Sequence, residues 1–236
     1  MSAAPLLQVS GLERSFVGGG TRFTLYVAHL ELLAGTQLAV VGPSGCGKST
    51  LLGLLAMALR PDAGATMLLE GTDVLDLWRH NRVDTLTRLR AARIGFVPQT
   101  AALLPFLSLG ANIALPQRLG GLDEPDYLRA LAKVLGIDHI LGRRPGEVSV
   151  GQRQRAAVAR ALAHRPRLLL ADEPTASVHP TQAAEIMALL TSVTVELGTA
   201  LVIATHDIDA AAAAGCSIAA CQPDATANAS SFAWPV

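Results

Sequence analysis

One glycine-rich segment, residues 42–50, constrains this chain more than any other. It fits the pattern G-x-x-x-x-G-K-[ST], which follows a strand and opens a helix in phosphate-binding loops. Its members are Gly42, Pro43, Ser44, Gly45, Cys46, Gly47, Lys48, Ser49 and Thr50. The apolar run 37–41 precedes it, and residues 48–59 are predicted to form a helix that stops before Pro61. Because glycines let several backbone N–H groups turn toward one anion, the segment predicts a phosphate site.

Two side chains of this loop are suited to a nucleotide and its metal ion. Lys48 can neutralise the β- and γ-phosphates, and the hydroxyl of Ser49 can hold Mg²⁺. The competing interpretation is a glycine-rich turn that matches the pattern by chance. The preceding strand, the lysine and the hydroxyl together disfavour that alternative.

A pair of carboxylates follows the apolar run 168–171. Strand ends in a parallel sheet are where ligands bind, so Asp172 and Glu173 are candidate site residues. Asp172 is expected to hold Mg²⁺, directly or through water, and Glu173 to act as general base toward the attacking water. An acidic loop after a strand is common by itself, and the phosphate loop is what favours the functional interpretation.

Strand and helix patterns alternate along the chain and predict an α/β fold with a mainly parallel sheet. Predicted strands span residues 6–9, 23–27, 37–41, 67–69, 94–97, 168–171 and 200–204. Predicted helices span residues 48–59, 151–164 and 180–197, and a helical insertion spans 100–148. The last twenty residues are expected to be partly loose.

Composition argues against several functional classes. Lys plus Arg equals Asp plus Glu at 19 each, whereas a nucleic-acid binder usually has a basic excess. The longest apolar stretches, 51–59 and 210–214, are shorter than the roughly 20 residues that span a bilayer, and no signal peptide is expected. Cys46, Cys216 and Cys221 have no metal-ligand spacing and fit reduced thiols.

The segment 148–155, which reads VSVGQRQR, discriminates among proteins with such a loop. It resembles the Leu-Ser-Gly-Gly-Gln signature of the ABC transporter ATPase family, and the resemblance covers nearly the whole chain. Ser149 and Gly151 would begin a helix, whose N-terminus favours anions. The resemblance implies that Ser149, Gly151 and Gln152 cap the γ-phosphate of ATP held by a second copy, in a head-to-tail dimer.

The same resemblance implies roles for three further residues. Gln99 is expected to touch Mg²⁺ and the attacking water, and His206 to contact the γ-phosphate. Phe16 is expected to stack on adenine, although Phe23 and Tyr26 lie nearby and offer the same flat face. A single Gln, His or Phe is usually structural, and it is the order of these residues along the chain that favours a functional role.

The fold that the resemblance implies is a P-loop NTPase with a RecA-like core. Residues 1–99 and 150–221 would form this core with a small antiparallel β subdomain. Residues 100–149 would form the helical subdomain associated with the signature, and residues 222–236 a tail. The whole chain, 1–236, would be a single ABC ATPase domain.

Two positions depart from the family pattern. Val150 replaces the usual glycine of the signature, and His179 stands where the family has Asp in a loop that crosses the dimer interface. These changes put the hydrolysis rate in question. One alternative is therefore a regulatory or signalling subunit that binds ATP and hydrolyses it weakly. A soluble ABC ATPase of DNA repair or translation is a further alternative, disfavoured by the neutral charge and the absence of a tandem copy.

Segments near Gln99 are similar to one ABC subfamily, the ATPases of lipoprotein release, macrolide efflux and cell division. The similar segments are IGFVPQ at 94–99, LLP at 103–105, ANIALP at 111–116 and LTRLR at 86–90. This similarity implies a permease partner with a large extracytoplasmic domain and a position on the inner face of the cytoplasmic membrane. Nucleic acid is not an expected partner.

Overall fold

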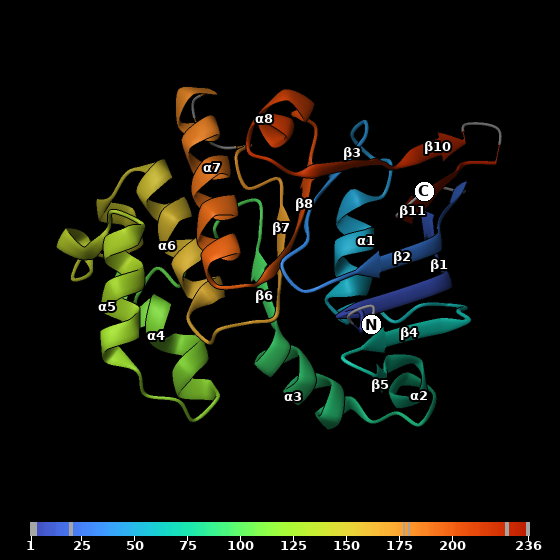
Figure 1. The fold of residues 1–236 in the computed structure, drawn as a ribbon, viewed down its shortest axis with the longest axis horizontal. Helices are drawn as coiled ribbons and strands as arrows, with labels where there is room; N and C mark the ends of the chain where they lie inside the picture. Colours follow the sequence, from blue (N-terminus) through green and yellow to red (C-terminus); the bar gives the residue numbers. More distant parts are fainter. Residues whose placement is uncertain (1–3, 19–20, 177, 179, 225–226, 235–236) are drawn as a thin grey trace.

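The computed structural model describes residues 4–18, 21–176, 178, 180–224 and 227–234. It contains two sheets and a group of helices. A five-stranded parallel sheet has the order β6-β7-β8-β3-β9, and a six-stranded sheet has the order β10-β11-β2-β1-β4-β5. Figure 1 shows the parallel sheet between the helices on the left and the second sheet on the right.

The parallel sheet is built from short apolar runs. Its strands are β3 (Gln37–Val41), β6 (Ile94–Val97), β7 (Leu168–Asp172), β8 (Ala200–Thr205) and β9 (Ser217–Ala220). Alternate residues enter two different cores. Val40 and Leu170 pack in the core shared with the second sheet, whereas Ala39 and Leu169 pack in the core under the helices. Burial on both faces explains the uninterrupted apolar runs and confirms the predicted parallel sheet.

The six-stranded sheet is centred on a long hairpin. Its strands are β1 (Leu7–Gly18), β2 (Thr21–Leu32), β4 (Thr66–Leu69), β5 (Thr72–Asp73), β10 (Gln222–Asp224) and β11 (Ala229–Trp234). The predicted strands 6–9 and 23–27 were too short, because the extensions hold few buried apolar residues, such as Leu12 and Leu30, among polar ones. Only the segments richest in apolar residues were recognisable as strands in the sequence.

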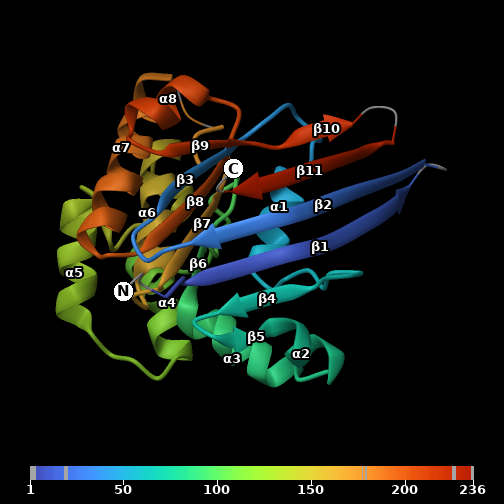
Figure 2. The ribbon, with the colours of Figure 1, turned by 45° about the vertical axis from the view of Figure 1, so that its right-hand side comes forward.

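The prediction that the last twenty residues are partly loose is wrong for their described part. β11 pairs in parallel with β2 and antiparallel with β10, and the three strands lie side by side in Figure 2. Phe232 is 1% exposed and belongs to the core under this sheet. The free edge of β2 supplies backbone partners that the Ala- and Ser-rich composition of the segment does not reveal.

Eight α-helices are described. They are α1 (Lys48–Leu55), α2 (Val74–Arg79), α3 (Val83–Arg93), α4 (Leu109–Leu119), α5 (Pro125–Val134), α6 (Val150–Leu162), α7 (Pro180–Glu196) and α8 (Ile208–Ala213). The helix predicted over 48–59 ends four residues early, at Leu55, because Met57 adopts a left-handed backbone and the Leu59 N–H turns back to Gly53 O. Among the described helices, none combines the length and apolarity needed to cross a membrane.

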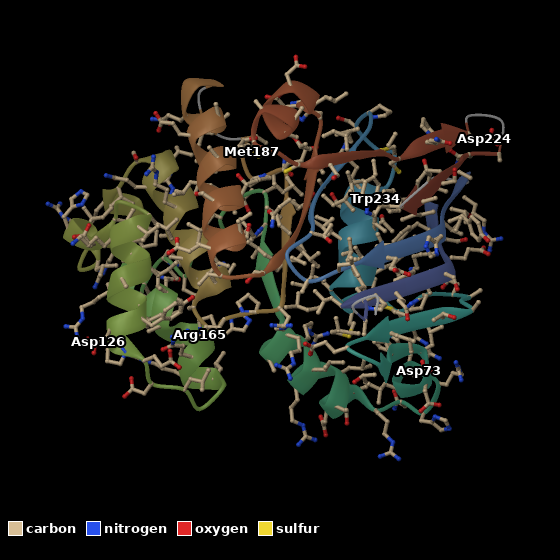
Figure 3. All side chains as sticks on the ribbon, viewed as in Figure 1. Asp73, Asp126, Arg165, Met187, Asp224 and Trp234 are labelled. Carbon is tan, nitrogen blue, oxygen red and sulfur yellow. The ribbon has the colours of Figure 1, made fainter. Side chains whose placement is uncertain are left out.

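The segment between β6 and α6 is helical. It holds α4, α5 and two short 3-10 turns, Asp138–Ile140 and Pro145–Glu147, and both helices pack against α6. Arg165, labelled in Figure 3, stacks on Tyr127 at 4.1 Å and forms an ion pair with Glu124 at 2.7 Å. These contacts fix α5 to the connection between α6 and β7.

Candidate functional site

The glycine-rich loop connects β3 to α1 at the carboxyl edge of the parallel sheet. β3 lies between β8 and β9, so the loop emerges beside the ends of those two strands. Gly45 and Gly47 have φ angles of 81° and 97°, which only glycine adopts without strain. A Cβ on Gly47 would also lie 3.3 Å from Phe23 and from Leu25. Gly45 and Gly47 are therefore required by the backbone of this loop.

Lys48 is the cation of the loop. It is only 5% exposed, and its Nζ donates to Gly42 O at 2.8 Å and to Pro43 O at 3.1 Å. Glu173 Oε1 lies 3.6 Å from the same nitrogen. A buried ammonium with three oxygen neighbours is held in one place, so its charge is directed into the loop.

Two of the three residues predicted for Mg²⁺, Ser49 and Asp172, meet at the edge of the sheet. Ser49 Oγ donates to Asp172 Oδ1 at 3.1 Å, which joins the start of α1 to the end of β7. Burial raises the pKa of Asp172 and Glu173 raises it further, while the Ser49 hydrogen bond and Lys48 act in the opposite direction. A divalent cation would relieve the cost of ionising this carboxylate. A hydroxyl and a carboxylate are also the hard oxygen donors that Mg²⁺ prefers, so these residues fit the ion.

Glu173 lies between two basic side chains. Its Oε2 is 3.2 Å from His206 Nδ1, and its Oε1 faces Lys48. Its backbone adopts a left-handed φ of 43°, and its N–H donates to Ala204 O at 2.9 Å. Such strain in a residue other than glycine is frequent at functional sites, where it aims a side chain. The carboxylate is thereby fixed beside the loop.

A cavity of about 460 Å³ opens over the loop. It is lined by Phe16, Phe23, Ser44, Gly45, Gly47, Lys48, Ser49, Thr50, Gln99 and Glu173. Asp172 and His206 reach it through their bonds to Ser49 and Glu173. Of the remaining loop residues, Gly42 and Pro43 accept from Lys48 through their carbonyls, and Cys46 is buried.

The lining of this cavity separates the three aromatic residues that were candidates for stacking on adenine. Phe16 and Phe23 are cross-strand partners on β1 and β2 and both line it, whereas Tyr26 is not among the lining residues. Arg14, which the sequence did not single out, stacks its guanidinium over the Phe16 ring at 5.0 Å. Its spacing of two residues from Phe16 puts both on one face of β1, and that periodicity was the available signal.

The signature residues lie in a second, separate place. Ser149 caps α6, because its hydroxyl accepts from Gln152 N at 3.2 Å while Gln152 Oε1 accepts from Ser149 N at 3.0 Å. With Gly151 they line a cavity of about 260 Å³ that shares no lining residue with the first. Val150 is 41% exposed at the start of α6, and His179 lies outside the described residues. The structure therefore does not bring Ser149, Gly151 and Gln152 to the loop of their own chain.

Known proteins resemble this chain in both sequence and fold. Residues 25–176 match the family described as "ABC transporter". The lipoprotein-releasing system ATP-binding protein LolD 2 of Caulobacter vibrioides is 40% identical over 211 residues, which cover 88% of this chain and 90% of that protein. The LolD protein of Idiomarina loihiensis is 37% identical over 210 residues, or 87% of this chain and 90% of that one.

Solved structures agree with the sequence relatives. The ATP-binding cassette MJ0796, described as dimeric in a post-hydrolysis state bound to ADP and Pi, is 31% identical with a TM-score of 0.73. The match covers 87% of this chain and 90% of that one. CbiO1 of Clostridium perfringens, part of the cbiONQ complex, is 29% identical with a TM-score of 0.76 over 92% of this chain and 84% of its own.

Proposed function

Because the chain belongs to the ABC transporter family, we propose that it drives lipoprotein release. It is the ATP-hydrolysing subunit of such a system and uses ATP and Mg²⁺. The proposal rests on relatives whose names are those of lipoprotein-releasing ATP-binding proteins, 35–40% identical over most of the chain. Its partner is an integral membrane permease with an extracytoplasmic domain. It therefore acts at the inner face of the cytoplasmic membrane, held there by the permease.

The position of Glu173 is the observation that carries the catalytic roles. Its carboxylate lies beside Lys48 and His206, and Glu173 directly follows Asp172, which bonds to Ser49. Lys48 exchanges the loop carbonyls for the β- and γ-phosphates of ATP, and Ser49 and Asp172 hold the metal ion. Glu173 orients the attacking water and accepts its proton.

The remaining candidates complete the site. Gln99 lines the cavity after β6, where its amide would contact the metal ion and the attacking water once they are bound. His206 donates to the γ-phosphate, and Phe16 stacks on adenine with Phe23 beside it. Mg²⁺ supplies positive charge that neutralises the phosphates as the bond to the leaving group breaks.

The separation of the two cavities supports a head-to-tail homodimer. Ser149, Gly151 and Gln152 present the positive end of α6, a helix of 13 residues, to a cavity that the phosphate loop of the same chain does not line. A second copy supplies the ATP for this end. ATP thus closes the dimer, closure moves the permease, and hydrolysis resets both.

Weak hydrolysis is the second candidate function, favoured by one observation. The exposed Val150 side chain occupies the start of α6 in place of hydrogen. A regulatory subunit would bind ATP and release phosphate only at background rate, even with the permease present. Measuring phosphate release from Val150→Gly decides the cause, because a rate well above that of the unaltered chain would assign the low rate to this side chain.

The experiment that tests the proposed function is a pull-down of tagged Glu173→Gln protein from detergent-solubilised membranes with MgATP. Without the general base, the dimer is expected to stay closed on ATP and retain its partner. Recovery of a permease with few membrane helices and a large extracytoplasmic domain supports lipoprotein release. Glu196→Gln, an exposed position on α7, is the matched control. A permease with many membrane helices, or no membrane protein, would contradict the proposal.

A further inference from the structure

Two cysteines that are distant in the sequence lie against each other beneath the phosphate loop. Cys46 belongs to the loop and is 4% exposed, and Cys221 follows β9 and is 2% exposed. Cys221 Sγ donates to Cys46 O at 2.9 Å. A Cβ built on Gly42 would lie 2.8 Å from Cys46 Sγ and 3.4 Å from Cys221 Cβ. The two side chains therefore share one small space.

The parallel sheet creates this pair. β3 and β9 are neighbours in register, with Val41 opposite Ala220, so the residues that follow each strand emerge together. Cys221 N–H also donates to Val41 O at 2.8 Å, which extends the pairing to the cysteine. Cys216, by contrast, packs in the other core, under the helices. Cys46 and Cys221 are thus held close by backbone hydrogen bonds and not by the loop alone.

The electrostatic surroundings give the two thiols different reactivity. Burial, with a smaller contribution from Cys46, raises the pKa of the Cys221 thiol to about 12, and Lys48 opposes this shift. Cys221 therefore stays protonated near neutral pH and is a poor first nucleophile. Cys46 stands between Gly45 and Gly47, which line the nucleotide cavity, and is the more exposed cysteine of the pair, so we expect an oxidant to reach its sulfur first.

We propose that Cys46 and Cys221 are a redox modification site, at which a peroxide forms a disulfide that blocks nucleotide binding. The Cys46 sulfur attacks one peroxide oxygen, releases water and becomes a sulfenic acid. The Cys221 sulfur then attacks the Cys46 sulfur, loses its proton and expels a second water. The two thiols lose two electrons in total, and the peroxide accepts them.

The crosslink acts through the loop's own hydrogen bonds, and this step rests on the proposed nucleotide site. Cys46 N–H donates to Pro43 O at 3.3 Å, while Lys48 Nζ donates to the carbonyls of Gly42 and Pro43. Phosphate binding requires these donors to turn from the loop carbonyls toward the anion. A disulfide anchors Cys46 to the end of β9 and keeps the donors where they are.

The test treats the purified, reduced full-length chain with hydrogen peroxide, with and without MgATP, and reads two quantities. Peptide mapping is expected to find a Cys46–Cys221 crosslink, with the loss of two hydrogen atoms, that MgATP slows. Titration with a fluorescent ATP is expected to show loss of binding after oxidation and recovery with dithiothreitol. Because Cys221 is protonated, crosslinking should accelerate as the pH rises above neutral.

Two substitutions serve as matched controls. Cys221→Ser keeps a donor toward Cys46 O and should bind ATP normally but resist the peroxide, whereas Cys216→Ser should remain sensitive. Absence of the 46–221 peptide would overturn the site, and so would equal sensitivity of Cys221→Ser. A crosslinked chain that still binds ATP would overturn the proposal that the disulfide blocks nucleotide binding. If the reduced chain binds no ATP, the proposed function fails, and the mapped crosslink still decides whether the site exists.

Discussion

Two regions of this protein are organised in opposite ways. We call them the phosphate-loop corner, around the cavity lined by Lys48 and Glu173, and the signature corner, around the cavity lined by Ser149 and Gln152. At the first, Glu173 contacts both Lys48 and His206, and the Ser49 hydroxyl meets the half-buried carboxylate of Asp172. At the second, Ser149 and Gln152 satisfy each other across the first turn of α6. Charged side chains that pair with one another over the loop indicate a reactive site. A helix start whose polar groups already bond to each other indicates a surface that binds a ligand held by another chain.

The largest expected effect is at the first corner. Lys48→Ala removes the only ammonium over the loop within the described residues, and we expect at least about a 100-fold loss of ATP affinity. Titration with a fluorescent ATP measures it. Lys133→Ala, at the exposed end of α5, is the matched control and should bind like the unaltered chain. Equal affinity of the two variants for ATP would show that Lys48 does not bind the phosphates.

The pH dependence of the first corner follows from Asp172. Burial raises its pKa, so the folded chain holds this proton more tightly than the unfolded chain does. Without nucleotide, stability should therefore fall as the pH rises from the usual Asp pKa through the raised one. MgATP binding should show the reverse and weaken as the pH falls into that range.

Asp172→Asn separates these two effects. It should raise the melting temperature of the nucleotide-free chain at neutral pH, because a neutral side chain replaces a partly buried charge. It should also reduce the gain in ATP affinity that Mg²⁺ provides, because a charged ligand of the metal ion is replaced by a neutral one. Asp84→Asn, exposed on α3, is the control. A lowered melting temperature for Asp172→Asn alone would show that the Ser49 hydrogen bond outweighs the cost of burial.

The aromatic wall of the first corner is expected to give an intermediate effect. If Phe16 stacks on adenine, Phe16→Ala should weaken ATP binding by about 10-fold, the range of one stacking contact. Phe23 packs against Gly47, so Phe23→Ala should instead lower stability with a smaller change in affinity. Tyr26→Ala is the control. The reversed order of affinities would assign the adenine to Phe23.

The smallest expected effect is at the second corner. Ser149→Ala removes a helix cap and should cost about 1 kcal/mol of folding stability, and Ser108→Ala, which uncaps α4, should cost a similar amount. Only Ser149→Ala should weaken ATP-dependent dimerisation, measured by size-exclusion chromatography. Neither should change ATP binding to the monomer. Equal dimerisation of both variants would remove the signature from the interface.

The two corners also differ in how far the sequence predicted them. The loop 42–50 could be located from its residues, because its glycines have backbone angles that few other residues adopt. The contact between Ser49 and Asp172 joins residues 123 positions apart, and strand order alone predicts only their neighbourhood. Arg14 over Phe16 had a signal in the two-residue spacing along β1, whereas the position of Cys221 under the loop depends on a sheet pairing that no local pattern encodes. The tail strand β11 was missed for the same reason.

The most direct measurement of the central claim mixes two inactive variants. Lys48→Ala has no working phosphate loop, and Gly151→Asp adds a carboxylate to the signature corner, where the nearest atom to a new Cβ is Gln182 Oε1 at 3.4 Å. A head-to-tail pair of these chains retains one intact site, formed by the loop of one copy and the signature of the other. The account predicts that the mixture releases phosphate from ATP when neither variant does so alone. A mixture no more active than its separate components would contradict it.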